Sequence, residues 1–380
     1  MILARFLSKF FAKEGIVLID SQGQKYICGD LKNKEKPLTL KLLKKDLNWK
    51  LLIYPELYMG EEYYKGNIEI ENGTIHDFLD LALKNLGRKK INLYSTIVNN
   101  LVYGYKFLSN HNFVRASKKN AEMHYNRGED LYDWMLDKEH RQYSCGIFKD
   151  PKETLEQAQT NKLAHIVKKL NLKPGQRVLD IGCGWGGLSR YIAKEVGCEV
   201  HGISLASNQI EYCKKKSRES KLDNLLSYEL CDYREVKGTW DRIVNIGFFE
   251  HVSPKFYKTF FTRIHDLLKD NGDSLCLTHT IATTNPPGPP NPFIEKYIFN
   301  GGKVPSASQI TQAIEKSGLV ISGWESLIDH YNFTLDHWRK RFLENVGKAK
   351  KVYGPNFVRL WDFYLSSCSA AFKWSDLLVY

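Results

Sequence analysis

The chain has 380 residues, of which 43% are hydrophobic and 26% are charged, and its formal net charge is +12. This length allows two domains with substantial cores, and the composition excludes extended disorder. No apolar run reaches the roughly 20 residues that cross a bilayer, because charged residues interrupt each candidate stretch. The positive charge indicates attraction to nucleic acid or to an anionic membrane surface, unless it reflects compositional bias alone.

The eight cysteines are scattered through the chain, without a CxxC motif or zinc-finger spacing of Cys and His. This pattern predicts a reducing, cytoplasmic environment and no structural metal. The first 17 residues are interrupted by charges, and no small-residue cleavage site follows them. We therefore expect no secretory signal.

Residues 1–12 predict an amphipathic helix. Its apolar residues recur at helical spacing, whereas Arg5 and Lys9 fall on another side. Two interpretations stay open: the apolar face packs on its own domain, or it enters a lipid interface with the basic residues toward the headgroups. The apolar set comprises Ile2, Leu3, Phe6, Leu7, Phe10 and Phe11.

Residues 15–73 contain short apolar stretches separated by turn-forming residues, which predicts a small strand-rich unit. Helical patterns follow at 76–86 and 91–108, and we expect a basic linker near 117–120. The sequence therefore predicts an amino-terminal domain over residues 1–115 and a second domain over residues 116–380.

From residue 173 onward, strand and helix patterns alternate. Strands are predicted at 177–181, 198–203, 241–246 and 274–278, and helices at 187–196, 207–221 and 256–268. Such alternation specifies an α/β fold with an open, mainly parallel sheet covered on both faces. Ligands of such sheets bind at the carboxyl ends of the strands. The proline-rich stretch 286–292 is predicted to be a loop or lid.

A glycine-rich segment, Leu179-Asp-Ile-Gly-Cys-Gly-Trp-Gly-Gly187, joins the first of these strands to its helix. The GxGxxG spacing alone is a weak signal, since it also occurs at dinucleotide sites. However, the second strand ends without the acid that binds the ribose of NAD, and Asp180 directly precedes the glycines. The segment resembles the first motif of class I S-adenosylmethionine methyltransferases.

This resemblance implies a Rossmann-like, mainly parallel seven-stranded sheet beside a smaller α+β amino-terminal domain, with S-adenosylmethionine as cofactor. Gln209 is expected to reach a ribose hydroxyl, and the segment around Asp232 to meet the adenine, although Asp232 could instead be a solvated strand-end residue. The expected cofactor residues are Tyr143, Ser144, Asp180, Gly182, Gly184, Gly187, Ser204, Leu205, Gln209, Asp232 and Tyr233.

Further motifs resemble cyclopropane fatty acid synthases, in the same order and over about residues 124–372. Met59-Gly-Glu-Glu-Tyr63 also resembles the amino-terminal region of the bacterial members that act on phospholipids. The motifs of the second domain are Tyr125, Arg127-Gly-Glu-Asp-Leu131, Gln142-Tyr-Ser-Cys-Gly146, Gly247-Phe-Phe-Glu-His-Val252, His279-Thr-Ile281, Lys296-Tyr-Ile-Phe299, His330-Tyr331 and Thr334-Leu335.

The family resemblance implies methylene transfer from S-adenosylmethionine to a double bond of an unsaturated phospholipid in the membrane. The reaction passes through a carbocation, and a bound bicarbonate removes its proton. The resemblance places the bicarbonate shell at Cys145, Glu250, His279, Ile281 and Tyr331. It also implies a cytoplasmic enzyme, peripheral at the inner face of an anionic membrane; a homodimer is one assembly that the sequence leaves open.

Structural interpretations of the same residues stay open: Cys145 as a small buried hydrophobe, Glu250 as a surface residue and His279 as a core histidine. Ala282 stands where relatives often have Gly, and the chain ends soon after its last helical pattern, so a carboxyl-terminal strand could be trimmed. Alternative functions are a small-molecule or methyl-branching methyltransferase and a non-catalytic lipid-binding module. The absence of a recognition motif argues against a nucleic-acid methyltransferase.

Overall fold

The computed structural model describes residues 1–32, 34–87 and 129–380. The chain divides into two compact units, which we describe separately. The first unit comprises Met1–Ser109, Gly288–Ile298 and Leu335–Asp376, and the second comprises Asn110–Pro287, Phe299–Thr334 and Leu377–Tyr380. In the described part of the chain, no helix is both long and apolar enough to cross a membrane.

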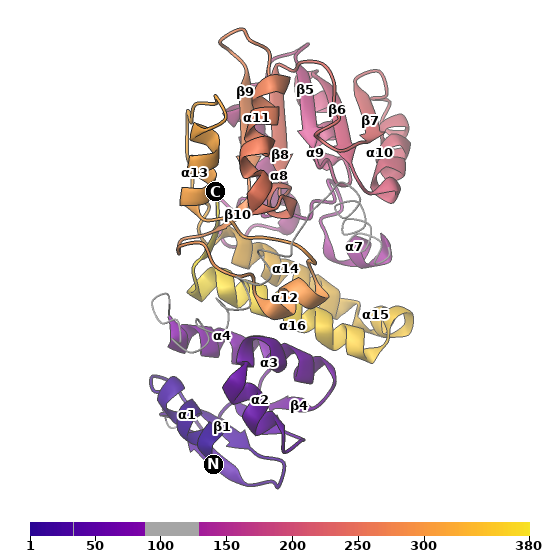
Figure 1. The fold of residues 1–380 in the computed structure, drawn as a ribbon. Coiled ribbons are helices and arrows are strands. Elements are labelled where there is room, and N and C mark those ends of the chain that lie inside the picture. Colours follow the sequence, from indigo (N-terminus) through magenta and orange to yellow (C-terminus); the bar gives the residue numbers. More distant parts are fainter. Residues whose placement is uncertain (33, 88–128) are drawn as a thin grey trace. The chain divides into compact units, whose positions relative to one another are not determined.

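The second unit is built on a parallel sheet with the strand order β7-β6-β5-β8-β9, which runs from right to left in Figure 1. The order reverses between β5 and β8, so the chain has a topological switch point there. The predicted α/β class is confirmed. The strands are β5 (Arg177–Ile181), β6 (Glu199–Ser204), β7 (Leu226–Leu230), β8 (Arg242–Ile246) and β9 (Leu275–His279).

Helices cover both faces of this sheet because its strands carry apolar side chains on both faces, with successive residues pointing to opposite sides. Leu179 and Ile181 of β5 pack with residues of α11 and α13, whereas Val178 packs with residues of α8, α9 and α10. Two separate cores result, one on each face. Among the residues of this unit that the structure describes, the helices that lie wholly within it are α7 (Glu129–Met135), α8 (Leu155–Lys169), α9 (Gly187–Val196), α10 (Ser207–Glu219), α11 (Tyr257–Leu267) and α13 (Ala307–Glu315).

The expectation of seven strands in one sheet needs correction. Five strands form the parallel sheet, while β10 (Ile281–Thr283) and β11 (Leu377–Val379) form a separate antiparallel pair. Between α13 and the next helix, residue Leu327 makes only an isolated bridge, to Val379. Without a continuous ladder of hydrogen bonds, this segment adds no strand to the sheet.

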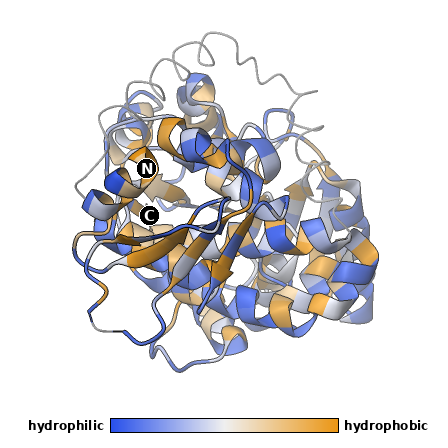
Figure 2. Cartoon of the chain, turned by 90° about the horizontal axis from the view of Figure 1, so that it is seen from below, coloured by the Kyte–Doolittle hydropathy of each residue, from blue (hydrophilic) through white to orange (hydrophobic). Residues whose placement is uncertain are grey.

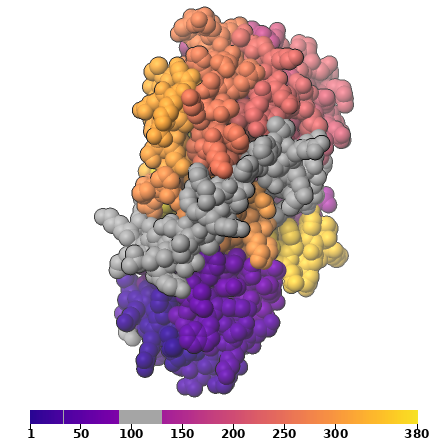
Figure 3. Space-filling view, in the orientation of Figure 1, coloured from indigo at the N-terminus to yellow at the C-terminus, as the bar shows by residue number. Residues whose placement is uncertain are grey.

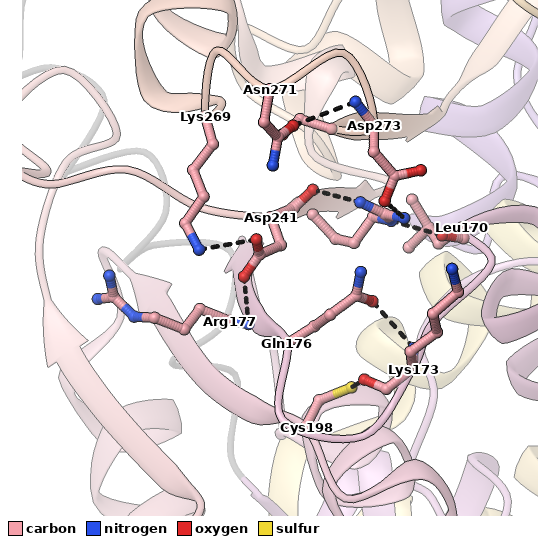
Figure 4. A network of polar contacts seen from close by, with 11 residues as sticks. Leu170, Lys173, Gln176, Arg177, Cys198, Asp241, Lys269, Asn271 and Asp273 are labelled. Atoms are coloured by element: carbon pink, nitrogen blue, oxygen red, sulfur yellow. Dashed lines mark hydrogen bonds and ion pairs between the residues drawn. The ribbon is translucent and has the colours of Figure 1, made fainter.

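A polar network ties the amino-terminal ends of β5 and β8 together (Figure 4). Asp241 accepts hydrogen bonds from the Arg177 backbone N–H at 2.9 Å and from Lys269 Nζ at 2.7 Å. The buried Arg242 guanidinium donates to the carbonyl of Leu170 and to the carboxylate of Asp273. These bonds satisfy polar groups where strands and connections meet, at the end of the strands remote from their carboxyl ends.

The first unit contains a four-stranded mixed sheet with the order β2-β1-β3-β4. This confirms the predicted strands. Two helices over residues 47–64 also occur, which the sequence pattern did not predict. The elements are β1 (Ile16–Ile19), β2 (Lys25–Cys28), β3 (Thr39–Leu42), β4 (Ile68–Glu71), α1 (Ile2–Phe10), α2 (Leu47–Ile53), α3 (Pro55–Tyr64) and α4 (Ile75–Leu86).

Three later helices complete the first unit: α12 (Pro292–Tyr297), α15 (Val346–Tyr353) and α16 (Pro355–Trp374). A further helix, α14 (His330–Glu344), runs from one unit into the other. Helix α16 packs on α4 and α3. Part of the carboxyl-terminal helices, yellow in Figure 3, is exposed at the surface. In Figure 2 the helices alternate between hydrophobic and hydrophilic residues, as expected of helices that bury one side.

A single boundary at residue 115 therefore does not describe the division, because α12, α15 and α16 bury their apolar sides in the first unit. The boundary itself, the helix expected at 91–108, the linker at 117–120 and the motif residues Tyr125 and Arg127 lie outside the described residues. The proline-rich stretch before α12 has no regular structure, as predicted.

The predicted amphipathic helix at the amino terminus is confirmed as α1. Leu3 of this helix and Phe11, directly after it, are each 1% exposed, so they pack in the first unit, whereas Ile2 is 60% exposed. Phe6 and Phe10 are half-buried and stack with their ring centroids 6.2 Å apart. Structural packing thus accounts for Phe11, while Ile2, Phe6 and Phe10 keep accessible surface.

Candidate active site

The glycine-rich segment forms the turn between β5 and α9. Gly182, Gly184 and Gly186 all have positive φ angles, which residues with a Cβ rarely adopt. The N–H groups of Gly182 and Cys183 donate to the carbonyl of Ile203 in β6, at 2.9 and 3.0 Å. The turn is therefore fixed against the neighbouring strand at the point where β5 ends.

A pocket opens at the carboxyl ends of the strands, beside the switch point. Its wall comes from the turn after β5, the turn after β6, the segment after β7 and the start of the segment after β8. Ten of the eleven expected cofactor residues line it, so the fold brings together residues up to 90 positions apart: Tyr143, Ser144, Asp180, Gly182, Gly184, Ser204, Leu205, Gln209, Asp232 and Tyr233.

Gly187, the eleventh expected cofactor residue, is not part of the lining. A Cβ at this position would lie 2.0 Å from the carbonyl oxygen of His140. Glycine is required here because the backbone before Gln142 packs directly against the start of α9.

The remaining lining residues were not among the expected ones. Several belong to predicted motifs or flank them, so the motifs and their neighbouring positions carried a usable signal. Asn300 and Gly301 directly follow the motif that ends at Phe299. The additional residues are Arg141, Gln142, Cys183, Trp185, Leu188, Arg234, Ile246, Gly247, Phe248, His251, Val252, Ser253, Phe256, Asn300 and Gly301.

Buried polar residues of the pocket are held in defined positions. Ser189 Oγ donates to Asp180 Oδ2 at 2.6 Å, and burial raises the pKa of Asp180 to about 6. Ser204 Oγ donates to Gln209 Oε1 at 2.9 Å. Hydrogen bonds of this kind fix the orientation of polar groups that face a ligand.

The carboxylate of Asp232 forms an ion pair with the side chain of Arg234. Arg234 donates to it through Nε at 2.8 Å and through a terminal nitrogen at 2.7 Å, which is a bidentate ion pair. Asp232 is only 3% exposed. Its interpretation as a solvated residue is therefore wrong; whether it meets an adenine stays a prediction.

Glu250 and Ile281 of the expected bicarbonate shell are in direct contact. The backbone N–H of Ile281 donates to Glu250 Oε1 at 2.6 Å. The other oxygen, Oε2, is buried and has no hydrogen-bond partner in the part of the chain that the structure describes. Burial raises the pKa of Glu250 to about 7, although the Ile281 N–H opposes this shift.

His279 lies at the end of β9, two residues before Ile281. Its carbonyl accepts the N–H of Gly247, which ties it to the segment that carries Glu250. Both ring nitrogens are buried without a partner among the described residues. Burial, followed by the charge of Lys162, lowers the pKa of His279 to about 3, so the ring is neutral at physiological pH.

Thr334 links the segment that carries Cys145 to helix α14, which also carries Tyr331. The hydroxyl of Thr334 accepts the N–H of Gly146 at 3.0 Å and also hydrogen-bonds the Cys145 thiol. Tyr331 lies one turn earlier on the same side of α14. Burial raises the pKa of the Cys145 thiol to about 12, so it is not a thiolate nucleophile.

The shell residues therefore come from two groups of linked segments, one that carries Glu250, His279 and Ile281 and one that carries Cys145 and Tyr331. None of the five residues lines the pocket described above. Each group adjoins a lining segment, since Ser144 precedes Cys145 and His251 follows Glu250. In the described part of the chain, no cluster of three or more His, Cys, Asp or Glu residues could hold a metal ion.

Comparison with known proteins identifies the family. The family described as mycolic acid cyclopropane synthetase matches residues 113–380. The chain belongs to this family. It is 39% identical over 269 residues to cyclopropane-fatty-acyl-phospholipid synthase of Escherichia coli K12, covering 70% of this chain and 68% of the relative. It is also 31% identical over 324 residues to sphingolipid C9-methyltransferase A of Emericella nidulans, covering 80% and 60%.

Solved structures of the family share the fold. The cyclopropane synthase MmaA2 from Mycobacterium tuberculosis superimposes with a TM-score of 0.65 at 29% identity, over 69% of this chain and 95% of that chain. Mycolic acid cyclopropane synthase CmaA1, in complex with SAH and CTAB, gives 0.64 at 29% identity, over 69% and 95%. This member of the mycolic acid cyclopropane synthetase family is thus an S-adenosylmethionine-dependent methyltransferase of the lipid-modifying type, with a class I fold.

Proposed function

We propose that the chain transfers a methylene group from S-adenosylmethionine to the cis double bond of unsaturated phospholipid acyl chains and closes a cyclopropane ring. The identity to the Escherichia coli enzyme supports the phospholipid substrate. The observation that carries the mechanism is the set of buried polar atoms without partners at Glu250 and His279. Buried polar atoms are nearly always hydrogen-bonded, so these atoms favour a small polar ligand between them.

The first task of the site is positioning, because an isolated alkene is a weak nucleophile. Holding two reactants in line can lower a barrier by about 7 to 11 kcal/mol in favourable cases. The glycines of the turn after β5 allow the cofactor to approach the backbone, while Gln209 and Asp180 present fixed polar groups.

The second task is to protect a carbocation from water. Aromatic side chains close part of the pocket wall: Tyr233 and Phe248 lie with their ring centroids 5.7 Å apart, and Phe248 stacks on Phe260. Apolar walls keep water away from a reactive intermediate. Their ring faces also stabilise a positive charge.

The third task is removal of a proton from the added methyl group. A bicarbonate bound between Glu250 and His279 would supply the base. Neutral His279 can donate through one ring nitrogen and accept through the other, and Glu250 can accept or hold a proton at its Oε2 atom. Because the pKa of Glu250 is about 7, this carboxyl group can exchange protons near neutral pH.

The substrate lies in a membrane, so the protein must reach a lipid surface. The net charge of +12 and the accessible apolar side of α1 support peripheral binding to the anionic inner face of a membrane. In this proposal Ile2, Phe6 and Phe10 contact the lipid and Arg5 and Lys9 its headgroups.

The proposal is tested by expression in a bacterial host that lacks cyclopropane lipids, followed by mass spectrometry of its fatty acids. The expected product is a chain that gains one CH₂ and loses its double bond to a ring. A methyl-branched product or a methylated amine with unchanged lipids would instead support the alternative activities.

The base is tested separately with purified protein and unsaturated phospholipid vesicles. Glu250→Gln should lower turnover by roughly 10²- to 10⁴-fold, as for loss of general acid–base catalysis, while S-adenosylmethionine binding is retained. Wild-type activity should fall when carbon dioxide is stripped from the buffer and recover with added bicarbonate. Full activity of a protein shown to be bicarbonate-free would contradict the assignment.

A further inference from the structure

Lys162 is a buried cation that the proposed mechanism does not use. It lies in α8 and is 1% exposed, whereas Lys168 of the same helix is exposed. Its ammonium donates to Gln142 Oε1 at 2.7 Å and to Ser144 Oγ at 2.9 Å. No described carboxylate forms an ion pair with it. An ammonium group without a counter-ion is costly to bury, so this position needs an explanation.

The two acceptors of Lys162 are part of the pocket wall. Gln142 and Ser144 line the pocket on either side of Tyr143, which also lines it. Gln159, one turn before Lys162 on α8, donates from Nε2 to the backbone carbonyl of Ser144 at 2.9 Å. Three hydrogen bonds from one side of α8 therefore hold the 142–144 segment in place.

The charge of Lys162 also reaches both groups of shell residues. It adds to the lowering of the His279 pKa by burial, and it opposes the rise that burial causes in the pKa of the Cys145 thiol. Burial lowers the pKa of Lys162 itself to about 7, although nearby acidic groups oppose this shift. The titratable groups that its charge reaches are Asp137, His140, Cys145, Asp180 and His279.

We propose that Lys162 is a positioning residue of the methyltransferase: its ammonium form holds the 142–144 wall of the pocket in the geometry that binds the cofactor. Loss of the proton leaves two N–H donors but removes the positive charge, so the hydrogen bonds to Gln142 and Ser144 lose their charge assistance and hold this wall less firmly. The inference rests on cofactor binding in this pocket and not on the identity of the lipid product.

The test measures the affinity of the full chain for S-adenosylhomocysteine by calorimetry, from about pH 6.5 to about pH 8.5. Wild-type affinity should fall roughly tenfold or more over this range, because binding favours the protonated form of a group whose pKa in the free protein is about 7. Lys162→Met keeps the length of the side chain without its charge. It should bind weakly at the low end and show little pH dependence.

Three controls make the result specific. Lys168→Met, on the exposed side of α8, should behave as the wild type. Glu250→Gln should keep the pH dependence, although Glu250 titrates in the same range. Lys162→Arg keeps its charge at every pH tested, so it should bind without the loss at high pH. If circular dichroism shows that Lys162→Met does not fold, Lys162→Arg still tests whether the charge at residue 162 causes the pH dependence of the affinity.

An unchanged pH dependence in Lys162→Met, a pH-independent affinity of the wild type, or the wild-type loss of affinity in Lys162→Arg would each overturn the proposal. Because no lipid product is measured, failure of the cyclopropane assignment would leave these outcomes unaffected.

Discussion

At Gly184 the backbone has a φ angle of +53°, and an added Cβ would meet no protein atom within 4 Å. Gly182 differs, because its Cβ would lie 2.6 Å from Phe248. A side chain at 184 therefore enters the pocket, while one at 182 disturbs the aromatic wall. Of the two glycines, Gly184 is the one whose substitution tests the cofactor site.

We expect Gly184→Val to abolish measurable calorimetric binding of S-adenosylhomocysteine. Gly175→Val is the matched control, since Gly175 also has a positive φ angle and open space, but lies outside the pocket. Both variants should lose thermal stability through backbone strain, whereas only the first should lose affinity. Equal affinity of both folded variants would show that the cofactor does not approach Gly184.

The raised pKa of Glu250 predicts how the stability of the folded protein depends on pH. Its pKa rises from 4.5 to about 7 on folding, so the folded state holds a proton that the unfolded state releases. Wild-type stability should therefore fall as pH rises from about 4.5 to about 7, by an amount on the order of 3 kcal/mol for this shift. Glu250→Gln does not titrate and avoids this loss.

Urea denaturation of both proteins in carbonate-free buffer, near pH 5 and near pH 8, measures the effect. The variant should gain stability relative to the wild type between the two pH values. A difference that is the same at both would mean that the Glu250 carboxyl is ionised as readily in the folded protein as in the unfolded chain.

On the scale of single elements, helix α1 shows why its two sequence interpretations did not exclude each other. Leu3 and Phe11 pack in the first unit, and Ile2, Phe6 and Phe10 retain exposed surface. Periodicity reveals that a helix has an apolar side, but it does not reveal how much of that side its own domain covers.

Phe6→Ser together with Phe10→Ser should weaken binding to anionic vesicles, measured by sedimentation. Burial in lipid contributes about 1 kcal/mol for each ring that is already half-buried, so the combined loss is roughly thirtyfold. Val320→Ser, which removes an apolar side chain that is 88% exposed in the other unit, should have no effect. Equal vesicle binding by the wild type, the double variant and Val320→Ser would show that Phe6 and Phe10 do not contact lipid and that α1 only packs in its own domain.

Helices α2 and α3 were missed for a related reason. Residues 47–64 lie between strands and carry partly exposed apolar side chains such as Trp49 and Ile53, which give no clear amphipathic period. In contrast, β5, α9 and α11 were predicted almost to the residue, because turn-forming glycines and a clear hydrophobic period mark their limits.

For the whole molecule, the net charge of +12 predicts a salt-dependent attraction to anionic surfaces. Raising the ionic strength from 0.1 M to 1 M shortens the screening length from about 10 Å to about 3 Å. Binding to vesicles with anionic lipid should therefore fall at least about tenfold over this range. Binding to neutral phosphatidylcholine vesicles is the control and should vary little with salt. Salt-independent binding to anionic vesicles would show that the net positive charge does not contribute to membrane binding.

Local signals in the sequence determined the alternating strands and helices, the glycine turn at 182–186 and the family. These features depend on residues close in the chain, where hydrophobic period and glycine conformation act directly. Only the tertiary structure decided that Gly187 serves packing with His140, that α12, α15 and α16 join the first unit, and that Lys162 is a buried charge beside Ser144. Burial and partner choice depend on residues brought together from distant parts of the chain, and a lysine in an ordinary helical pattern gives no sign of which way it points.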